Sequence, residues 1–142
     1  MKRAFYLCLT LIMVLGWTAC GSKQENKIQE KVATTSSMVE VYYFHFTRRC
    51  VTCNAVESVS KKAIEKLYPE QLKSRMISFK IVNLDEDNSK DLADKLGVGG
   101  QCLIVVGGGK KIDLTSQGFM YARSNPEKLK AELKKAIDPL IK

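Results

Sequence analysis

The chain has 142 residues and a formal charge of +8 at pH 7, from 23 basic and 15 acidic residues. This length fits one ordinary domain plus appendages. The basic excess does not indicate a nucleic-acid surface, because the lysines and arginines are interleaved with acidic or apolar positions and no stripe of aromatic and basic residues accompanies them.

The N-terminus has the layout of a secretory signal. Lys2 and Arg3 precede an uncharged apolar run over residues 4–17. This run is shorter than the roughly 20 residues that a membrane-spanning helix needs. A basic start followed by a short apolar segment is typical of a signal peptide, which we predict over residues 1–19.

Directly after the apolar run, small residues meet a cysteine in the stretch "TACGS". This stretch resembles a bacterial lipoprotein signal, although Trp17 stands where that signal usually has leucine. The resemblance implies that Cys20 carries a lipid, and that the protein is exported and anchored to a bacterial membrane, facing the periplasm or the cell exterior. The alternative is a signal peptide or uncleaved anchor with an incidental cysteine.

Residues 20–37 contain few large apolar side chains and cannot bury enough surface to fold alone. We predict that they form the lipidation site and a flexible tether. Residues 38–142 remain, and they are numerous enough for a single packed core.

Within this domain, the apolar pattern alternates between strands and helices. Residues 38–46 are β-branched and aromatic at consecutive positions, which predicts a buried strand. From Cys53 the apolar residues recur at intervals of three and four, which predicts a helix that stops before Pro69. Further along we predict a strand over 76–85, a helix over 88–96 ended by Gly97, a strand over 102–106, a glycine turn into a fourth strand around 111–119, and a helix over 125–137. This order predicts an α/β fold with a partly parallel sheet.

Two cysteines, Cys50 and Cys53, lie where the first strand leads into the first helix. Such a pair is a redox-active dithiol, half of a zinc site or a structural staple. A zinc site needs a second pair of ligands, and the sequence has no other CxxC or histidine pair.

The surroundings of Cys50 favour its thiolate, which is the form that attacks a disulfide. A cysteine at a helix start faces unpaired backbone N–H groups, which favour negative charge. Arg48 and Arg49 add two cations directly before it. We therefore expect these arginines to tune the acidity of Cys50, and Cys53, one helical turn on, to release whatever Cys50 captures.

The element order, the placing of the CxxC and the stretch "LGVGGQCLIVVGGGK" resemble the thioredoxin superfamily over residues 38–142. The resemblance implies a central mixed four-stranded sheet flanked by helices, with Cys50 as the exposed attacking thiol and Cys53 as the resolving one. It also implies protein thiols and disulfides as partners, a second dithiol protein that donates or accepts electrons, and no organic cofactor.

The chain departs from the family pattern beside the pair. Arg49 replaces the usual tryptophan, and Val51 and Thr52 replace Gly-Pro between the cysteines, which leaves the direction of exchange open. Many members bury an acid beneath the resolving cysteine and a lysine nearby. These positions align with Phe44 and Ile81, so we expect no such acid and lysine here.

A third thiol, Cys102, takes the place of the family's cis-proline, which faces the dithiol. A non-proline residue there favours a trans peptide bond after Gln101, by roughly 2.5–4 kcal/mol, unless the bond is a strained cis one. We expect Gln101 and Cys102 to face the pair. Cys102 then traps a mixed disulfide, serves as a soft metal ligand or fills the core.

Two further side chains near the pair have structural explanations. His45 lies mid-strand among aromatic residues, which predicts a packed, hydrogen-bonded core histidine rather than a ligand or base. Glu57 lies one turn beyond Cys53, where a surface carboxylate is expected and a proton carrier is the alternative. The sequence thus predicts a thiol–disulfide oxidoreductase. The rivals are a metal or metalloid binder that uses Cys50, Cys53 and Cys102, and a scaffold domain without turnover.

Overall fold

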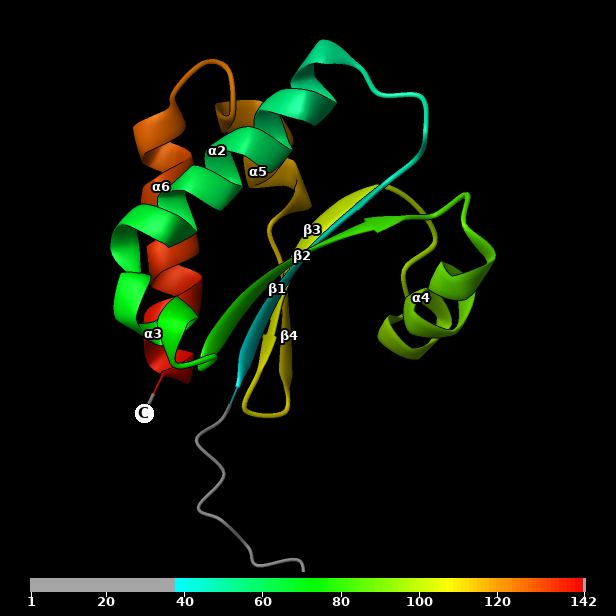
Figure 1. The fold of residues 1–142 in the computed structure, drawn as a ribbon. Coiled ribbons are helices and arrows are strands. Elements are labelled where there is room, and N and C mark those ends of the chain that lie inside the picture. The colour runs from blue at the N-terminus through cyan, green and yellow to red at the C-terminus, as the bar shows by residue number, and fades with distance from the viewer. Residues whose placement is uncertain (1–37, 142) are drawn as a thin grey trace, which may run out of the picture. The chain divides into compact units, whose positions relative to one another are not determined.

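Four strands form one mixed sheet in the computed structural model, which describes residues 38–141 (Figure 1). The strands are β1 (Val39–His45), β2 (Ile77–Asn83), β3 (Cys102–Gly107) and β4 (Lys110–Asp113). Their order across the sheet is β2-β1-β3-β4, with β1 and β2 parallel and the β1–β3 and β3–β4 pairs antiparallel. The predicted signal peptide, Cys20 and tether lie outside the described residues, so their boundaries stay predictions.

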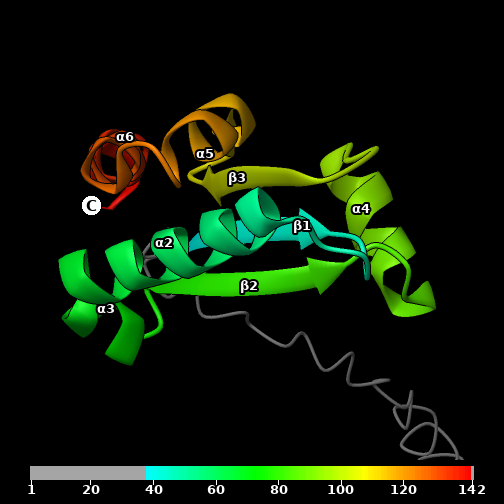
Figure 2. The same ribbon diagram turned by 90° about the horizontal axis from the view of Figure 1, so that it is seen from above.

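Helices lie on both sides of this sheet, as Figures 1 and 2 show. They are α2 (Val51–Leu67), α3 (Pro69–Lys73), α4 (Lys90–Leu96), α5 (Thr115–Tyr121) and α6 (Pro126–Ile137), with short 3-10 turns at Asp87–Ser89 and Asp138–Leu140. The predicted α/β architecture, a mixed four-stranded sheet flanked by helices, is confirmed. Between residues 38 and 141 no helix combines the length and the apolar character needed to span a bilayer.

Alternate residues of β1 belong to two different hydrophobic cores. Val41 and Tyr43 pack in the larger core, together with residues of α2 and α6. Tyr42 and Phe44 pack in a smaller core with Ala93 of α4. Because successive strand side chains point to opposite faces of a sheet, each residue of β1 faces either α2 or α4. This alternation decides which side chains can reach the cysteines.

Two predicted helix ends coincide with the capping residues that the sequence indicated, whereas α4 begins at Lys90, after a 3-10 turn, and not at residue 88. Asn125 caps α6 by accepting a hydrogen bond from the backbone N–H of Lys128, and Pro126 occupies the first turn. Gly97 ends α4 with a left-handed φ of 61°. Helix α2 ends at Leu67, and Pro69 then starts the short helix α3, which was not predicted.

Only residues 111–113 of the segment expected as a strand over residues 111–119 belong to a strand. β4 ends at Asp113, whose carboxylate accepts a hydrogen bond from the N–H of Thr115, and α5 follows. Gly118 lets α5 approach the core closely: a Cβ built there would lie 3.2 Å from Val56 Cγ1 and 3.3 Å from Leu103 Cδ2. The prediction was wrong because this long-range packing favours a helix that the local sequence does not signal.

The close approach at Gly118 predicts a stability effect. We expect Gly118→Leu to lower the free energy of unfolding by about 1–3 kcal/mol, because extra methylenes must displace Val56 and Leu103. Gly99→Leu is the matched control, since no atom lies within 4 Å of a Cβ built at that glycine. Urea unfolding measures both variants, and equal losses would contradict the packing described for α5.

Candidate active site

The cysteine pair lies at the junction between β1 and α2. Cys50 is the N-cap residue of α2, with φ −81° and ψ 165°, and its Sγ accepts a hydrogen bond of 3.0 Å from the backbone N–H of Cys53. The two sulfurs form a disulfide, with their Cα atoms 5.0 Å apart. Cys50 is exposed, whereas Cys53 is 5% exposed. The junction therefore presents one sulfur to solvent and keeps the other inside.

The start of α2 supplies the electrostatic environment of Cys50. The first turn of α2 carries no acidic residue, so no carboxylate offsets the positive end of its dipole. The N–H of Cys53 already points at Cys50 Sγ. When the disulfide is reduced, this N–H and the helix dipole favour a negative charge on that sulfur.

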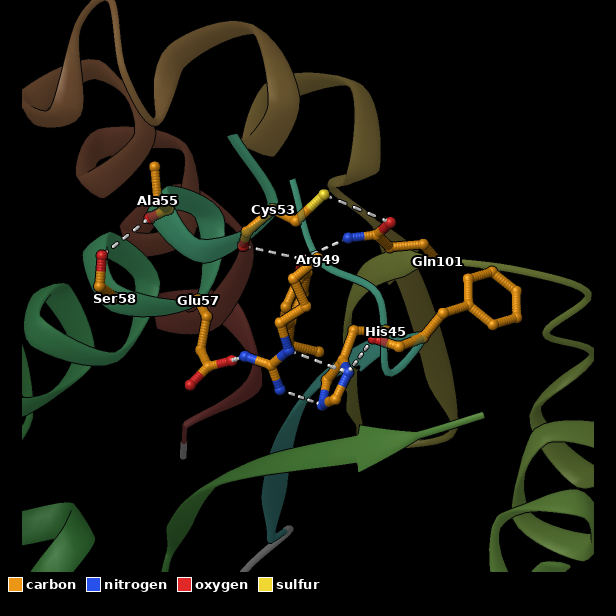
Figure 3. Close-up of polar contacts among 9 residues, drawn as sticks. His45, Arg49, Cys53, Ala55, Glu57, Ser58 and Gln101 are labelled. Carbon is orange, nitrogen blue, oxygen red and sulfur yellow. Dashed lines mark hydrogen bonds and ion pairs between the residues drawn. The ribbon is translucent and has the colours of Figure 1, made fainter. Parts of the chain in front are cut away.

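Arg49 does not extend toward the cysteines. Its guanidinium forms an ion pair with Glu57 of α2 and contacts the ring of His45 (Figure 3). Arg48 is exposed. The role expected for Arg48 and Arg49 at Cys50 stays a prediction, and the carboxylate of Glu57 offsets part of the charge of Arg49.

Glu57 and His45 are joined by this arginine. His45 is 5% exposed, and its Nδ1 lies 2.9 Å from the carbonyl oxygen of Phe46. Arg49 Nε donates a hydrogen bond of 3.2 Å to the same Nδ1, and Nε2 contacts a terminal guanidinium nitrogen of Arg49. His45 is therefore the buried, hydrogen-bonded histidine that we predicted. Glu57 is more enclosed than expected for a helix-surface carboxylate, since its side chain is 22% exposed.

Cys53 contacts two polar side chains from other elements. The hydroxyl of Tyr43 in β1 donates a 2.8 Å hydrogen bond to the carbonyl of Cys53. Gln101, just before β3, donates from Nε2 to that hydroxyl at 2.6 Å, and its Oε1 lies 3.7 Å from Cys53 Sγ (Figure 3). The expected position of Gln101 beside the pair agrees with this geometry. The sequence did not mark Tyr43 as a site residue. The one signal for it is that it lies two residues before His45, which puts both side chains on the face of β1 toward α2.

Phe44 does not lie beneath Cys53, contrary to the family alignment. It is fully buried in the smaller core, on the α4 side of the sheet. Its neighbour Tyr43 faces α2 instead. Ile81 pairs with Tyr43 across β1 and β2 and is 42% exposed. The residue types at these two aligned positions therefore do not decide which groups lie near Cys53, because Phe44 points away from it.

The side chain of Cys102 packs against the smaller core, which differs from the expectation that it faces the dithiol. Residues 38–141 contain no cis peptide bond, so the bond between Gln101 and Cys102 is trans, as predicted. Cys102 packs against the core that contains Phe44. Gln101 lies in the bend just before β3 and contacts Cys53, whereas Cys102, the first residue of β3, packs against the smaller core.

The three thiols of the described chain do not form a metal site. Within residues 38–141, no three histidine, cysteine, aspartate or glutamate side chains are placed to hold a metal ion together. Cys50 and Cys53 are bonded to each other, and Cys102 packs on the other side of the sheet. The metal alternative would need a rearrangement of all three residues.

The environment of Cys102 predicts slow alkylation. Burial raises the pKa of its thiol to about 11, with a smaller contribution from the charge of Asp113. Burial acts in this direction because it favours the neutral thiol. We expect iodoacetamide at pH 8 to modify Cys102 at least about 100-fold more slowly in the folded chain than in urea. Peptide mapping measures both rates, and equal rates would contradict the described burial.

Comparison with known proteins gives a similarity in structure. No protein-family model matches the chain, and no curated protein matches it. Among solved structures, the chain is similar to the crystal structure of thioredoxin O2 from Arabidopsis thaliana in the oxidised state. The identity is 20% and the TM-score 0.49, over 77% of this chain and 83% of that chain.

Proposed function

We propose that this protein is a thioredoxin-like thiol–disulfide oxidoreductase that acts on protein partners through Cys50 and Cys53. The observation that carries the proposal is the disulfide between an exposed cysteine at a helix N-cap and a buried cysteine one turn on. A zinc site would need further ligands beside Cys50 and Cys53, and no histidine, cysteine, aspartate or glutamate among the described residues completes such a group. An inert staple needs neither an exposed sulfur nor an N–H directed at it.

The chemistry proceeds in two exchanges. In the reduced protein, the Cys50 thiolate attacks a partner disulfide, forms a mixed disulfide and expels one partner sulfur as a thiolate. The sulfur of Cys53 then attacks Cys50, which closes the Cys50–Cys53 disulfide and expels the second partner sulfur. The partner gains two electrons and two protons, and the pair loses them. The reverse sequence oxidises a partner.

The surface around the pair supports a macromolecular partner. Val51, between the cysteines, is 70% exposed, and Phe46, in the segment before them, is 41% exposed. An exposed apolar side chain such as Val51 between the cysteines suits contact with another protein better than enclosure of a small molecule. A second dithiol protein would return the pair to its starting state.

We also propose that the protein works outside the cytoplasm, attached to a bacterial membrane by a lipid on Cys20. The support is the sequence around that cysteine. Radiolabelled palmitate fed to expressing bacteria tests the attachment. Label in the wild-type chain and none in Cys20→Ala is the expected result, and equal label in both would overturn the proposal.

The midpoint potential of the pair tests the redox function. We expect the pair to titrate in defined glutathione buffers as one two-electron couple. A value near −270 mV identifies a reductant, and one near −120 mV identifies an oxidant. Insulin reduction or refolding of a scrambled substrate then measures turnover. A pair that titrates but shows no turnover in either assay would overturn the proposed enzymatic function.

A further inference from the structure

Two side chains control which atoms face the sulfur of Cys53. Tyr43 is fully buried and Gln101 is half-buried, and they are linked to each other by a hydrogen bond of 2.6 Å. Tyr43 also contacts the carbonyl of Cys53, and Gln101 also contacts its sulfur. Cys53, Tyr43 and Gln101 therefore form a closed ring of contacts.

The direction of each hydrogen bond in this ring follows from the groups involved. A carbonyl oxygen only accepts, so the single hydrogen of the Tyr43 hydroxyl points at the carbonyl of Cys53. The hydroxyl oxygen must then accept from Gln101, which turns the amide nitrogen toward Tyr43. The amide oxygen is left facing Cys53 Sγ at 3.7 Å.

An amide oxygen beside a sulfur stabilises a thiol, because S–H donates to it, and destabilises a thiolate. The opposite holds at Cys50, whose sulfur faces a backbone N–H. The reduced pair therefore has a built-in asymmetry, with the negative charge favoured on Cys50 and the proton favoured on Cys53. To resolve a mixed disulfide, however, Cys53 must lose this proton, because the thiolate is the form that attacks.

We propose that Gln101, oriented by Tyr43, keeps the proton on Cys53 in the reduced protein and turns its amide to donate to the Cys53 thiolate during resolution. This inference rests on the proposed function. In the turned state, the amide nitrogen faces the sulfur and the Tyr43 hydroxyl donates to the amide oxygen, which releases the carbonyl of Cys53.

The step balances without a further reactant. Cys53 loses its proton to solvent, and its thiolate attacks Cys50 Sγ of the mixed disulfide. The bond between Cys50 and the partner breaks as the Cys50–Cys53 bond forms. The partner sulfur leaves with the electron pair and takes up a proton from solvent. Gln101 and Tyr43 are positioning residues in this step, because they are not consumed or oxidised.

Other titratable groups surround Cys53, and the experiment must separate them from Gln101. They are Cys50 of the pair, the phenol of Tyr43, the linked side chains of His45, Arg49 and Glu57, and the thiol of Cys102, whose charge would act on Tyr43. Helix α5, which packs against α2 at Gly118, carries no charged side chain. A site-specific readout of Cys53 is therefore required.

The test is the pH titration of the Cys53 ¹³Cβ resonance in the reduced full chain with labelled cysteine, assigned with Cys53→Ser. We expect Gln101→Glu to raise the midpoint pH by about one unit, which is about a tenfold loss of thiolate, because the carboxylate can only accept. We expect Tyr43→Phe to lower it by about half a unit, a roughly threefold gain, because the freed amide can turn toward the thiolate. Gln71→Glu and Tyr42→Phe are the matched controls, on α3 and on the opposite face of β1, and should leave the midpoint unchanged.

A midpoint pH that rises in Gln101→Glu and falls in Tyr43→Phe supports the inference. Two shifts in the same direction, or no shift, would overturn it, because a merely structural role of the two residues would not move the midpoint in opposite directions. A second readout is the decay of a mixed disulfide between Cys50 and thionitrobenzoate at pH 7. Gln101→Glu should slow it about tenfold without slowing its formation, and an unchanged decay would overturn the inference. The NMR titration needs no substrate, so absence of turnover in the wild-type chain would overturn the proposed function alone.

Discussion

Replacing Cys50 by serine is expected to abolish exchange, whereas replacing Cys53 by serine should arrest the reaction half-way. Cys50 presents the exposed sulfur at the N-cap, so its loss removes the attacking group. We expect turnover with insulin to fall by at least about 1,000-fold, the order of loss on removing a nucleophile. With Cys53→Ser, Cys50 still attacks, but no buried thiol remains to release the partner, and a mixed disulfide accumulates.

Non-reducing electrophoresis followed by mass spectrometry detects the arrested complex and identifies the sulfur that holds it. Cys102→Ser is the matched control, because Cys102 packs on the far side of the sheet, and it should retain turnover within about twofold. Two results would contradict the assignment of roles: turnover that survives Cys50→Ser, or a trapped partner attached to Cys102.

Periodicity and capping residues were sufficient to predict most of the fold. The consecutive apolar residues of β1, the three-and-four spacing in α2 and the Asn125–Pro126 start of α6 all have local causes, and each predicted element is present. Helix α5 has no such local signal. Its formation depends on Gly118 meeting Val56 and Leu103, which lie far away in the sequence.

The candidate site was predictable only in part, because some of its features are local in the sequence and others are not. The position of Cys50 and Cys53 at a strand–helix junction is a local feature, and the sequence revealed it. The face toward which a strand residue points is not local, because a shift of one residue reverses it. The alignment with the family pattern placed Phe44 beneath Cys53, while the structure places Tyr43 there.

The orientation of Phe44 predicts a large loss of stability when a carboxylate replaces its ring. Phe44→Asp introduces the acid that many thioredoxins carry at the aligned position. Here the side chain is fully buried with Tyr42, Ala93 and Ile104, so a carboxylate would lose its hydration without a partner. Removing the ring alone costs about 3–5 kcal/mol, and the unpaired acid adds to that loss. We expect the free energy of unfolding in urea to fall by at least that amount.

Ile81→Asp is the matched control, since it makes a comparable change on the neighbouring strand at a side chain that is 42% exposed, and we expect a loss below about 1 kcal/mol. Phe44→Leu separates the charge from the lost ring volume and should cost less than Phe44→Asp. If Phe44 instead faced Cys53, the aspartate would serve as a proton acceptor there and resolution of the mixed disulfide would accelerate. A stable, faster Phe44→Asp variant would therefore contradict the register of β1, and with it the assignment of Tyr43 and Gln101 to the sulfur of Cys53.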